Sequence, residues 1–165
     1  MSTEGSKARM LARVRTIADY QFGNGVGKAL FPDGCEFQLS QTGRVRQVLL
    51  GGERMATVRA QDGRLTLSFA GASRLREAIP PPGYRVSIVP SVSEFIATGK
   101  TCFAKHVIAA DPEIRAGDEV LVVTGDDELL ATGTALLSGA EMLSFNYGPA
   151  VKVREGRESG CSQEK

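Results

Sequence analysis

The stretch TGKTCFAKHVIA, residues 98–109, sets the fold expected for the second half of the chain. Its first three residues contain a glycine and favour a loop. We predict that residues 101–109 then form a strand, in which Lys105 and His106 point to opposite faces. Because burying a lysine is costly, Lys105 is expected to reach solvent or a phosphate, whereas His106 also fits the edge of a core.

Further short strands are predicted around this stretch. Residues 125–127, Gly-Asp-Asp, have the composition of a hairpin turn. Two short helices are expected at 92–97 and 138–145, the second capped by Ser138. The other strands of this half are predicted at 84–89, 119–124, 129–137 and 150–154. Many short strands with two short helices indicate a small closed or half-open barrel.

Pro80-Pro81-Pro82-Gly83 is the best candidate for a domain boundary. Three prolines cannot continue a helix and favour an extended connector. Before the boundary, apolar residues recur at helical spacing from Met10 to Phe22, after a polar tail. Strands are predicted at 35–40, 44–50, 54–59 and 64–69, followed by a helix at 71–79. The expected fold class is therefore α+β: a small N-terminal α/β domain, residues 8–79, and a mixed β-barrel, residues 84–156, with residues 157–165 as a flexible tail.

Charge is distributed unevenly between these halves. The chain has 165 residues, of which 42% are hydrophobic and 24% charged, as in ordinary globular proteins. Residues 1–83 contain twelve Lys and Arg against seven Asp and Glu, a net charge of +5. Residues 84–156 contain six against ten, a net charge of −4. The first half can attract a polyanion by bulk charge, whereas the second would need its basic residues gathered on one face.

Cysteine, histidine and hydropathy patterns exclude several classes of protein. Cys35, Cys102 and Cys161 are widely spaced and His106 is the one histidine, so a Cys/His zinc site is not expected. We predict reduced thiols, no cofactor and no metal. The N-terminus resembles no secretory signal and no apolar run would span a bilayer, so a cytoplasmic location is expected.

Four segments of the second half together resemble the PUA domain, an RNA-binding fold. They are GKTCFAKHV (99–107), IRAGDEVLVV (114–123), ATGTA (131–135) and GPAVKVREG (148–156). In the first half, ADYQFG (18–23), Gly27 and SQTGRVR (40–46) resemble the domain that precedes the PUA domain in archaeosine tRNA-guanine transglycosylases. The resemblance implies a PUA-like barrel and archaeal tRNA as a partner. The catalytic (β/α)₈ barrel of those enzymes does not fit into 165 residues together with these domains.

The candidate RNA-binding residues are Gly99, Lys100, Lys105, His106, Lys152, Arg154, Arg44 and Arg46. Glycine allows close approach of the backbone to a phosphate, and Lys100 beside Gly99 supplies charge; the resemblance places this loop against RNA. Lys152 and Arg154 alternate with Val151 and Val153 on the last strand, which leaves a basic exposed side. A plain turn and a solvated basic face remain the alternatives.

Two other motifs favour structural roles. GNGVGKA, residues 23–29, departs from the P-loop pattern because Phe22 and Ala29 occupy required positions, so glycines that end a helix are the better interpretation. The acids Asp111, Glu113, Asp118, Glu119, Asp126, Asp127 and Glu128 lie in turns without an enclosing apolar wall. We expect them to form a solvated face that repels RNA.

The sequence therefore predicts a non-catalytic RNA-binding protein. The leading hypothesis is a tRNA-binding accessory subunit for a separately encoded transglycosylase-type enzyme. The alternative is a stand-alone PUA protein that binds ribosomal RNA or acts in translation. A small enzyme is disfavoured because the chain has a single histidine and neither a metal pattern nor a nucleophile signature.

Overall fold

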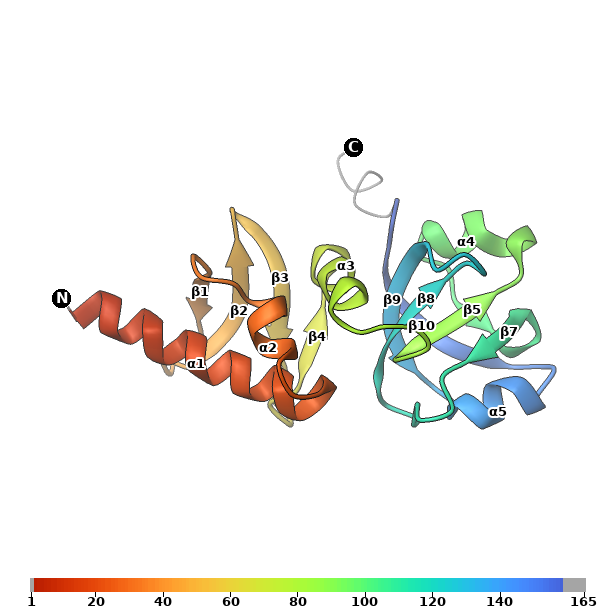
Figure 1. Cartoon of the computed structure of the whole chain (residues 1–165), viewed down its shortest axis with the longest axis horizontal. Helices are drawn as coiled ribbons and strands as arrows, with labels where there is room; N and C mark the ends of the chain where they lie inside the picture. The colour runs from red at the N-terminus through yellow and green to blue at the C-terminus, as the bar shows by residue number, and fades with distance from the viewer. Residues whose placement is uncertain (1, 159–165) are drawn as a thin grey trace. The chain divides into compact units, whose positions relative to one another are not determined.

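The computed structural model describes residues 2–158, and its contacts divide the chain into two units between Ile79 and Pro80 (Figure 1). Each unit has its own sheet. At the boundary, Pro81 to Tyr84 form a turn rather than an extended connector: the Gly83 N–H donates to the Pro80 carbonyl (3.0 Å), and the Arg85 N–H to that of Pro82 (2.9 Å).

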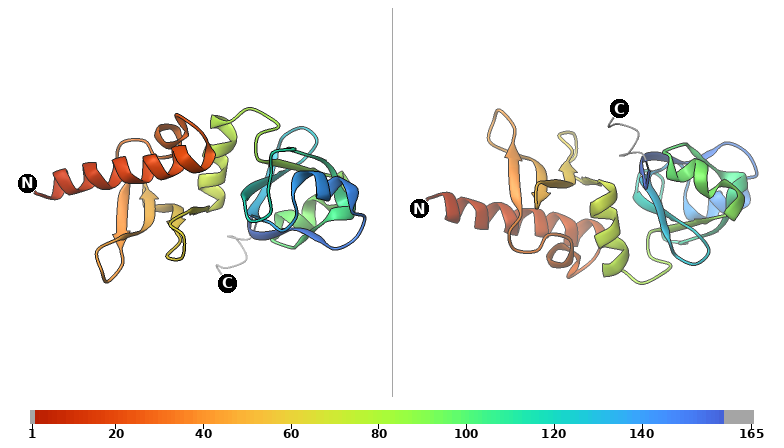
Figure 2. Two further views of the ribbon diagram at one scale, coloured as in Figure 1. Left: turned by 90° about the horizontal axis from the view of Figure 1, so that it is seen from below. Right: turned by 90° about the horizontal axis from the view of Figure 1, so that it is seen from above.

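The first unit packs three helices on a four-stranded antiparallel sheet with the order β1-β2-β3-β4. Its elements are α1 (Ser2–Phe22), α2 (Val26–Leu30), β1 (Glu36–Leu39), β2 (Val45–Leu50), β3 (Glu53–Val58), β4 (Leu65–Leu67) and α3 (Phe69–Ala78). Val14, Ala18 and Phe22 are buried at a spacing of four residues, which gives α1 one apolar stripe toward the core. The polar N-terminal part of α1 projects beyond the sheet (Figure 2).

Helix α1 begins earlier than predicted, at Ser2 rather than after a polar tail. Glu4 lies in its first turn, where a carboxylate favours the helix dipole. The glycines that follow have two different roles. Gly23 and Gly25 have positive φ angles of 127° and 87° at helix ends: Gly23 ends α1 as expected, and Gly25 precedes α2 as its N-cap. Gly27 lies inside α2, where a Cβ atom would collide with the Arg15 backbone, so it permits close packing of two helices.

The second unit is a nearly closed barrel whose six strands follow the order β6-β10-β9-β8-β5-β7 (Figures 1 and 2). Its elements are β5 (Arg85–Ile88), the 3₁₀ turn η1 (Pro90–Val92), α4 (Ser93–Ala97), β6 (Cys102–Phe103), the 3₁₀ turn η2 (Ala104–His106), β7 (Val107–Ala110), β8 (Glu119–Val123), β9 (Leu129–Ala135), α5 (Gly139–Ser144) and β10 (Pro149–Gly156). Strand β5 runs parallel to β8, and the other pairs are antiparallel. This mixed β-barrel with short helices is the predicted fold class.

Residues 101–109 do not form the single strand that was predicted. β6 pairs with β10 and β7 pairs with β5, and η2 turns the chain between these two edges. The Ala104 N–H donates to the Gly148 carbonyl (2.9 Å), and the His106 carbonyl accepts from the Val89 N–H (2.9 Å). A continuous strand would pair along one edge of the sheet only. Because β6 and β7 are the two edge strands, the η2 turn between them brings the edges together and nearly closes the barrel.

The core of the second unit contains buried residues of β5, β6, β8, β9 and β10, together with Ile96, Ile114 and Met142, and β7 packs against it through the partly buried Val107 and Ala110. Helix α5 begins with the predicted Ser138 cap, and Glu141 completes a capping box. Residues 157 and 158 belong to this unit: the Arg157 N–H donates to the Leu130 carbonyl (2.7 Å), and the Glu158 N–H to that of Ala97 (2.8 Å). The rest of the proposed flexible tail, 159–165, lies outside the described residues, as does Cys161.

Candidate nucleic-acid interface

The glycine loop of the second unit is fixed by the end of α4. The Gly99 N–H donates to the Ile96 carbonyl (2.9 Å), and the Lys100 N–H to that of Phe95 (3.1 Å). Gly99 has a φ of 101°, which an L side chain rarely adopts. This closure leaves the Lys100 side chain exposed two residues before the start of β6.

Pairing of β6 with β10 brings this loop beside the last strand. Cys102 is opposite Val151, and Phe103 is opposite Pro149. Lys152 on β10 and Lys100 just before β6 therefore lie at the same pair of antiparallel strands, although they are 52 positions apart in sequence. Both side chains are exposed, and neither forms an ion pair with any described residue.

Lys105 and His106 lie on η2, so they do not alternate across a sheet as predicted. The turn leaves Lys105 exposed and His106 half-buried. Lys105 follows β6 at the end opposite Lys100. The three lysines therefore lie on or beside the β6–β10 ribbon, and His106 joins the ribbon to β7.

Arg154 differs from these lysines. Its guanidinium binds the carboxylate of Glu119 through two contacts, one of them from Nη1 to Oε1 at 3.1 Å. The Glu119 side chain is only 3% exposed, so its charge requires a counterion. Arg154 reaches the surface but is not the free cation that strand alternation suggested.

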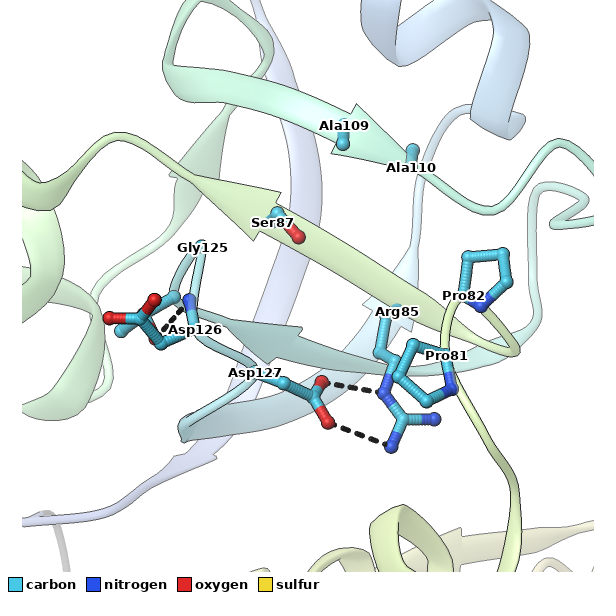
Figure 3. A pocket seen from close by; sticks show the side chains of 10 residues that line it. Pro81, Pro82, Arg85, Ser87, Ala109, Ala110, Gly125, Asp126 and Asp127 are labelled. Carbon is cyan, nitrogen blue, oxygen red and sulfur yellow. Dashed lines mark hydrogen bonds and ion pairs between the residues drawn. The ribbon is translucent and has the colours of Figure 1, made fainter.

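Two further acids have structural roles that the sequence did not reveal. Asp111 is buried and accepts hydrogen bonds from the backbone N–H groups of Tyr84 (2.8 Å) and Glu113 (3.0 Å). Asp127 binds the buried Arg85 through Nε–Oδ1 (2.7 Å) and Nη2–Oδ2 (3.2 Å), beside a hollow of about 350 Å³ (Figure 3). The prediction that all seven acids are solvated was therefore wrong for Asp111, Glu119 and Asp127.

An aromatic surface near the β6–β10 ribbon was missed by the sequence reasoning. The rings of Phe145 and Tyr147 stack with centroids 6.1 Å apart and planes 9° apart. Tyr147 is 73% exposed and directly precedes Gly148, which η2 contacts, and Phe103 on β6 is 42% exposed. Exposed aromatic rings beside lysines can stack on unpaired bases. The sequence Phe145-Asn146-Tyr147 before Gly148-Pro149 could have indicated this aromatic surface.

Arg44 and Arg46 belong to the first unit and both are exposed. Arg44 directly precedes β2 and Arg46 is its second residue, beside the turn formed by Ser40 to Gly43. The eight predicted residues therefore separate into six on the barrel and two on the N-terminal sheet.

The structure offers little support for thiol or metal chemistry within its described part. Cys35 and Cys102 are buried and free. Burial raises the pKa of Cys102 to about 12 and also raises the pKa of Cys35, although Arg15 and Arg74 oppose that shift. Among residues 2–158, no three His, Cys, Asp or Glu side chains are grouped to hold a metal ion. No helix in this range is long and apolar enough to cross a bilayer.

Comparison with known proteins matches each half of the chain to a domain family. Residues 84–157 match the PUA domain, and residues 12–82 match the patch-forming domain C2 of tRNA-guanine transglycosylase. The chain therefore contains a PUA domain in its second unit, and PUA domains are RNA-binding. More particularly, it combines a transglycosylase C2 domain with a PUA domain, as in the C-terminal part of archaeal tRNA-guanine(15) transglycosylases.

Individual relatives agree with this assignment. The chain is 53% identical over 147 residues to tRNA-guanine(15) transglycosylase of Pyrococcus abyssi, covering 89% of this chain and 25% of the relative. It is 48% identical over 147 residues to that of Methanothermobacter thermautotrophicus, covering 88% and 22%. A hypothetical protein from Pyrococcus horikoshii OT3 has the same fold, with a TM-score of 0.73, 21% identity, and coverage of 94% and 95%. The chain spans about a quarter of the transglycosylases, and this quarter is not their catalytic part.

Proposed function

We propose that this chain binds tRNA as a non-catalytic accessory to a tRNA-guanine transglycosylase-type enzyme. The observation that carries the proposal is the 53% identity to such an enzyme over its C2 and PUA domains, without the catalytic part. The proposal includes a separately encoded catalytic partner and a cytoplasmic location. Base exchange requires the catalytic enzyme to meet its tRNA, so the accessory chain, the enzyme and the tRNA must share one compartment.

The barrel surface supports the proposal in physical terms. The second half has a net charge of −4, so RNA binding by this half must depend on a local group of cations. Lys100, Lys105 and Lys152 provide that group along the β6–β10 ribbon. We propose that they bind backbone phosphates, with Gly99 and His106 shaping the surface, and that Phe145 and Tyr147 accept a base by stacking.

A base-exchange assay tests the proposed role. The chain is incubated with unmodified tRNA and labelled guanine, alone and together with the catalytic part of a matched archaeal transglycosylase made without its C2 and PUA domains. We expect no incorporation by the chain alone, because it lacks the catalytic part. Added to that part, it should lower the KM for tRNA several-fold by holding the substrate.

Either of two results would contradict the accessory role. One is incorporation of labelled base by the chain alone. The other is an unchanged KM of the catalytic part at saturating amounts of the chain.

A further inference from the structure

A groove of about 730 Å³ lies in the first unit, between α1 and the two hairpin turns at one end of the sheet. These turns join β1 to β2 and β3 to β4. The groove is lined by Arg13 of α1, Arg44 directly before β2, Arg46 of β2 and Arg59 after β3. The volume lies within the range of about 300–1,000 Å³ that is usual for ligand sites.

A β-bulge explains how three consecutive residues at the start of β2, from Arg44 to Arg46, reach this groove. Gln47 is opposite Gln38 and Val45 is opposite Leu39, so the pairing skips Arg46. A regular strand would send neighbouring side chains to opposite faces, whereas a bulge re-aims one of them. Arg44, Val45 and Arg46 can therefore all line the groove.

Three of its four arginines have no acidic partner among the described residues. Within residues 2–158, the side chains of Arg13, Arg44 and Arg46 form no ion pair and no hydrogen bond. Arg59 contacts Asp62 (Nε–Oδ1, 3.6 Å) and Gln61 (3.4 Å) within its own turn. The positive charges around the groove repel one another, and a bound polyanion would neutralise them.

The walls of the groove are apolar as well as basic. Val14 is buried, and Ile17, Val45 and Val58 are half-buried along its lining. A duplex backbone offers phosphates and sugars to such a surface but keeps its bases stacked. A single-stranded or looped segment can place a base against the apolar wall or a guanidinium plane while its phosphates contact the arginines.

We propose that this groove is a second RNA site, on the C2 domain, which binds a single-stranded or looped segment. This inference relies on the proposed function for RNA as the partner, and it adds a site that the barrel does not provide. Two sites on one chain increase the affinity for one RNA through effective concentration, provided that the RNA reaches both.

The test compares two double variants of the full chain with matched charge changes. The groove variant is Arg44→Glu with Arg46→Glu. The control is Lys7→Glu with Lys28→Glu, two exposed cations of the same unit that do not line the groove. The probes are a 12-nucleotide oligouridylate, a 12-base-pair RNA duplex and unmodified tRNA, with circular dichroism and thermal melting as checks of folding.

We expect the groove variant to bind the oligouridylate about tenfold more weakly at 0.15 M salt, as for the loss of two phosphate contacts to a single strand. The control should bind it nearly as well as the unchanged chain, and duplex binding by the groove variant should fall by less than about threefold. Three results would each overturn the groove site: equal losses of oligouridylate affinity in the groove variant and the control, equal losses of oligouridylate and duplex affinity in the groove variant, or no loss of oligouridylate affinity in the groove variant. If the unchanged chain still binds tRNA in those cases, the proposed function survives; if it binds no tRNA, both fail.

Discussion

Replacing Lys100 and Lys152 with glutamate together should weaken tRNA binding by about thirtyfold at 0.15 M salt. Lys152 lies on β10 and Lys100 lies just before β6, and neither has an acidic partner among residues 2–158. Each lysine that neutralises a backbone phosphate contributes about fivefold at this salt concentration, because it releases condensed counterions. Filter-binding titrations over a series of salt concentrations measure the effect, and the log–log slope should become shallower by about 2.

The matched control raises the charge by the same amount on other loops of the barrel. Glu113→Lys with Asp126→Lys changes two exposed acids that lie between β7 and β8 and between β8 and β9. Asp127 is unsuitable because its carboxylate binds Arg85. If net charge alone governed binding, the control would strengthen it as much as the lysine variant weakens it. Equal and opposite effects would therefore rule out a localised site.

The buried ion pair of the barrel should produce the largest loss of stability. We expect Asp127→Asn to lower the free energy of unfolding by about 2–3 kcal/mol, because removal of one partner leaves a buried charge uncompensated. The Arg85 side chain is 3% exposed, and its Nη1 also donates to the Gly83 carbonyl (3.1 Å). Asparagine is chosen because Asp127 has a φ of 66°, which asparagine tolerates and alanine does not.

Urea denaturation of the full chain, followed by circular dichroism, measures this loss. The neighbouring substitution Asp126→Asn is the control, since that side chain is exposed and should change stability by less than about 0.5 kcal/mol. Equal shifts of the urea midpoint in the two variants would show that the Arg85–Asp127 pair does not stabilise the barrel.

Much of the fold could be predicted from local patterns. Strands bounded by turn glycines, the Ser138 cap and the apolar stripe of α1 all depend on neighbours in sequence, and the structure contains them. The turn at Ala104–His106 could not be predicted in this way. It is fixed by hydrogen bonds to Gly148 and Val89, and these depend on how the barrel closes.

Among the charged residues too, exposure could be predicted from the sequence, whereas partners distant in sequence could not. Exposure of Lys105 followed from the cost of burying a lysine. The contacts of Glu119 with Arg154, of Arg85 with Asp127 and of Asp111 with Tyr84 did not follow from the sequence. The shortest of these three spans 27 positions, and all three form only in the folded barrel. The bulge at Arg46 is likewise a property of strand pairing, so the sequence indicated two arginines but not the groove that they share with Arg13.

The most direct test of the central claim is competition between RNAs for the full chain. Labelled, unmodified archaeal tRNA is bound at 0.15 M salt and challenged with unlabelled tRNA or with a structured ribosomal RNA fragment of equal length. Because both competitors carry the same number of phosphates, a difference between them reports recognition beyond bulk charge. A tRNA-binding accessory predicts that the ribosomal fragment is needed at a concentration at least about tenfold higher to displace half of the label. Displacement at equal concentrations, or more effective displacement by the ribosomal fragment, would contradict a tRNA-binding function.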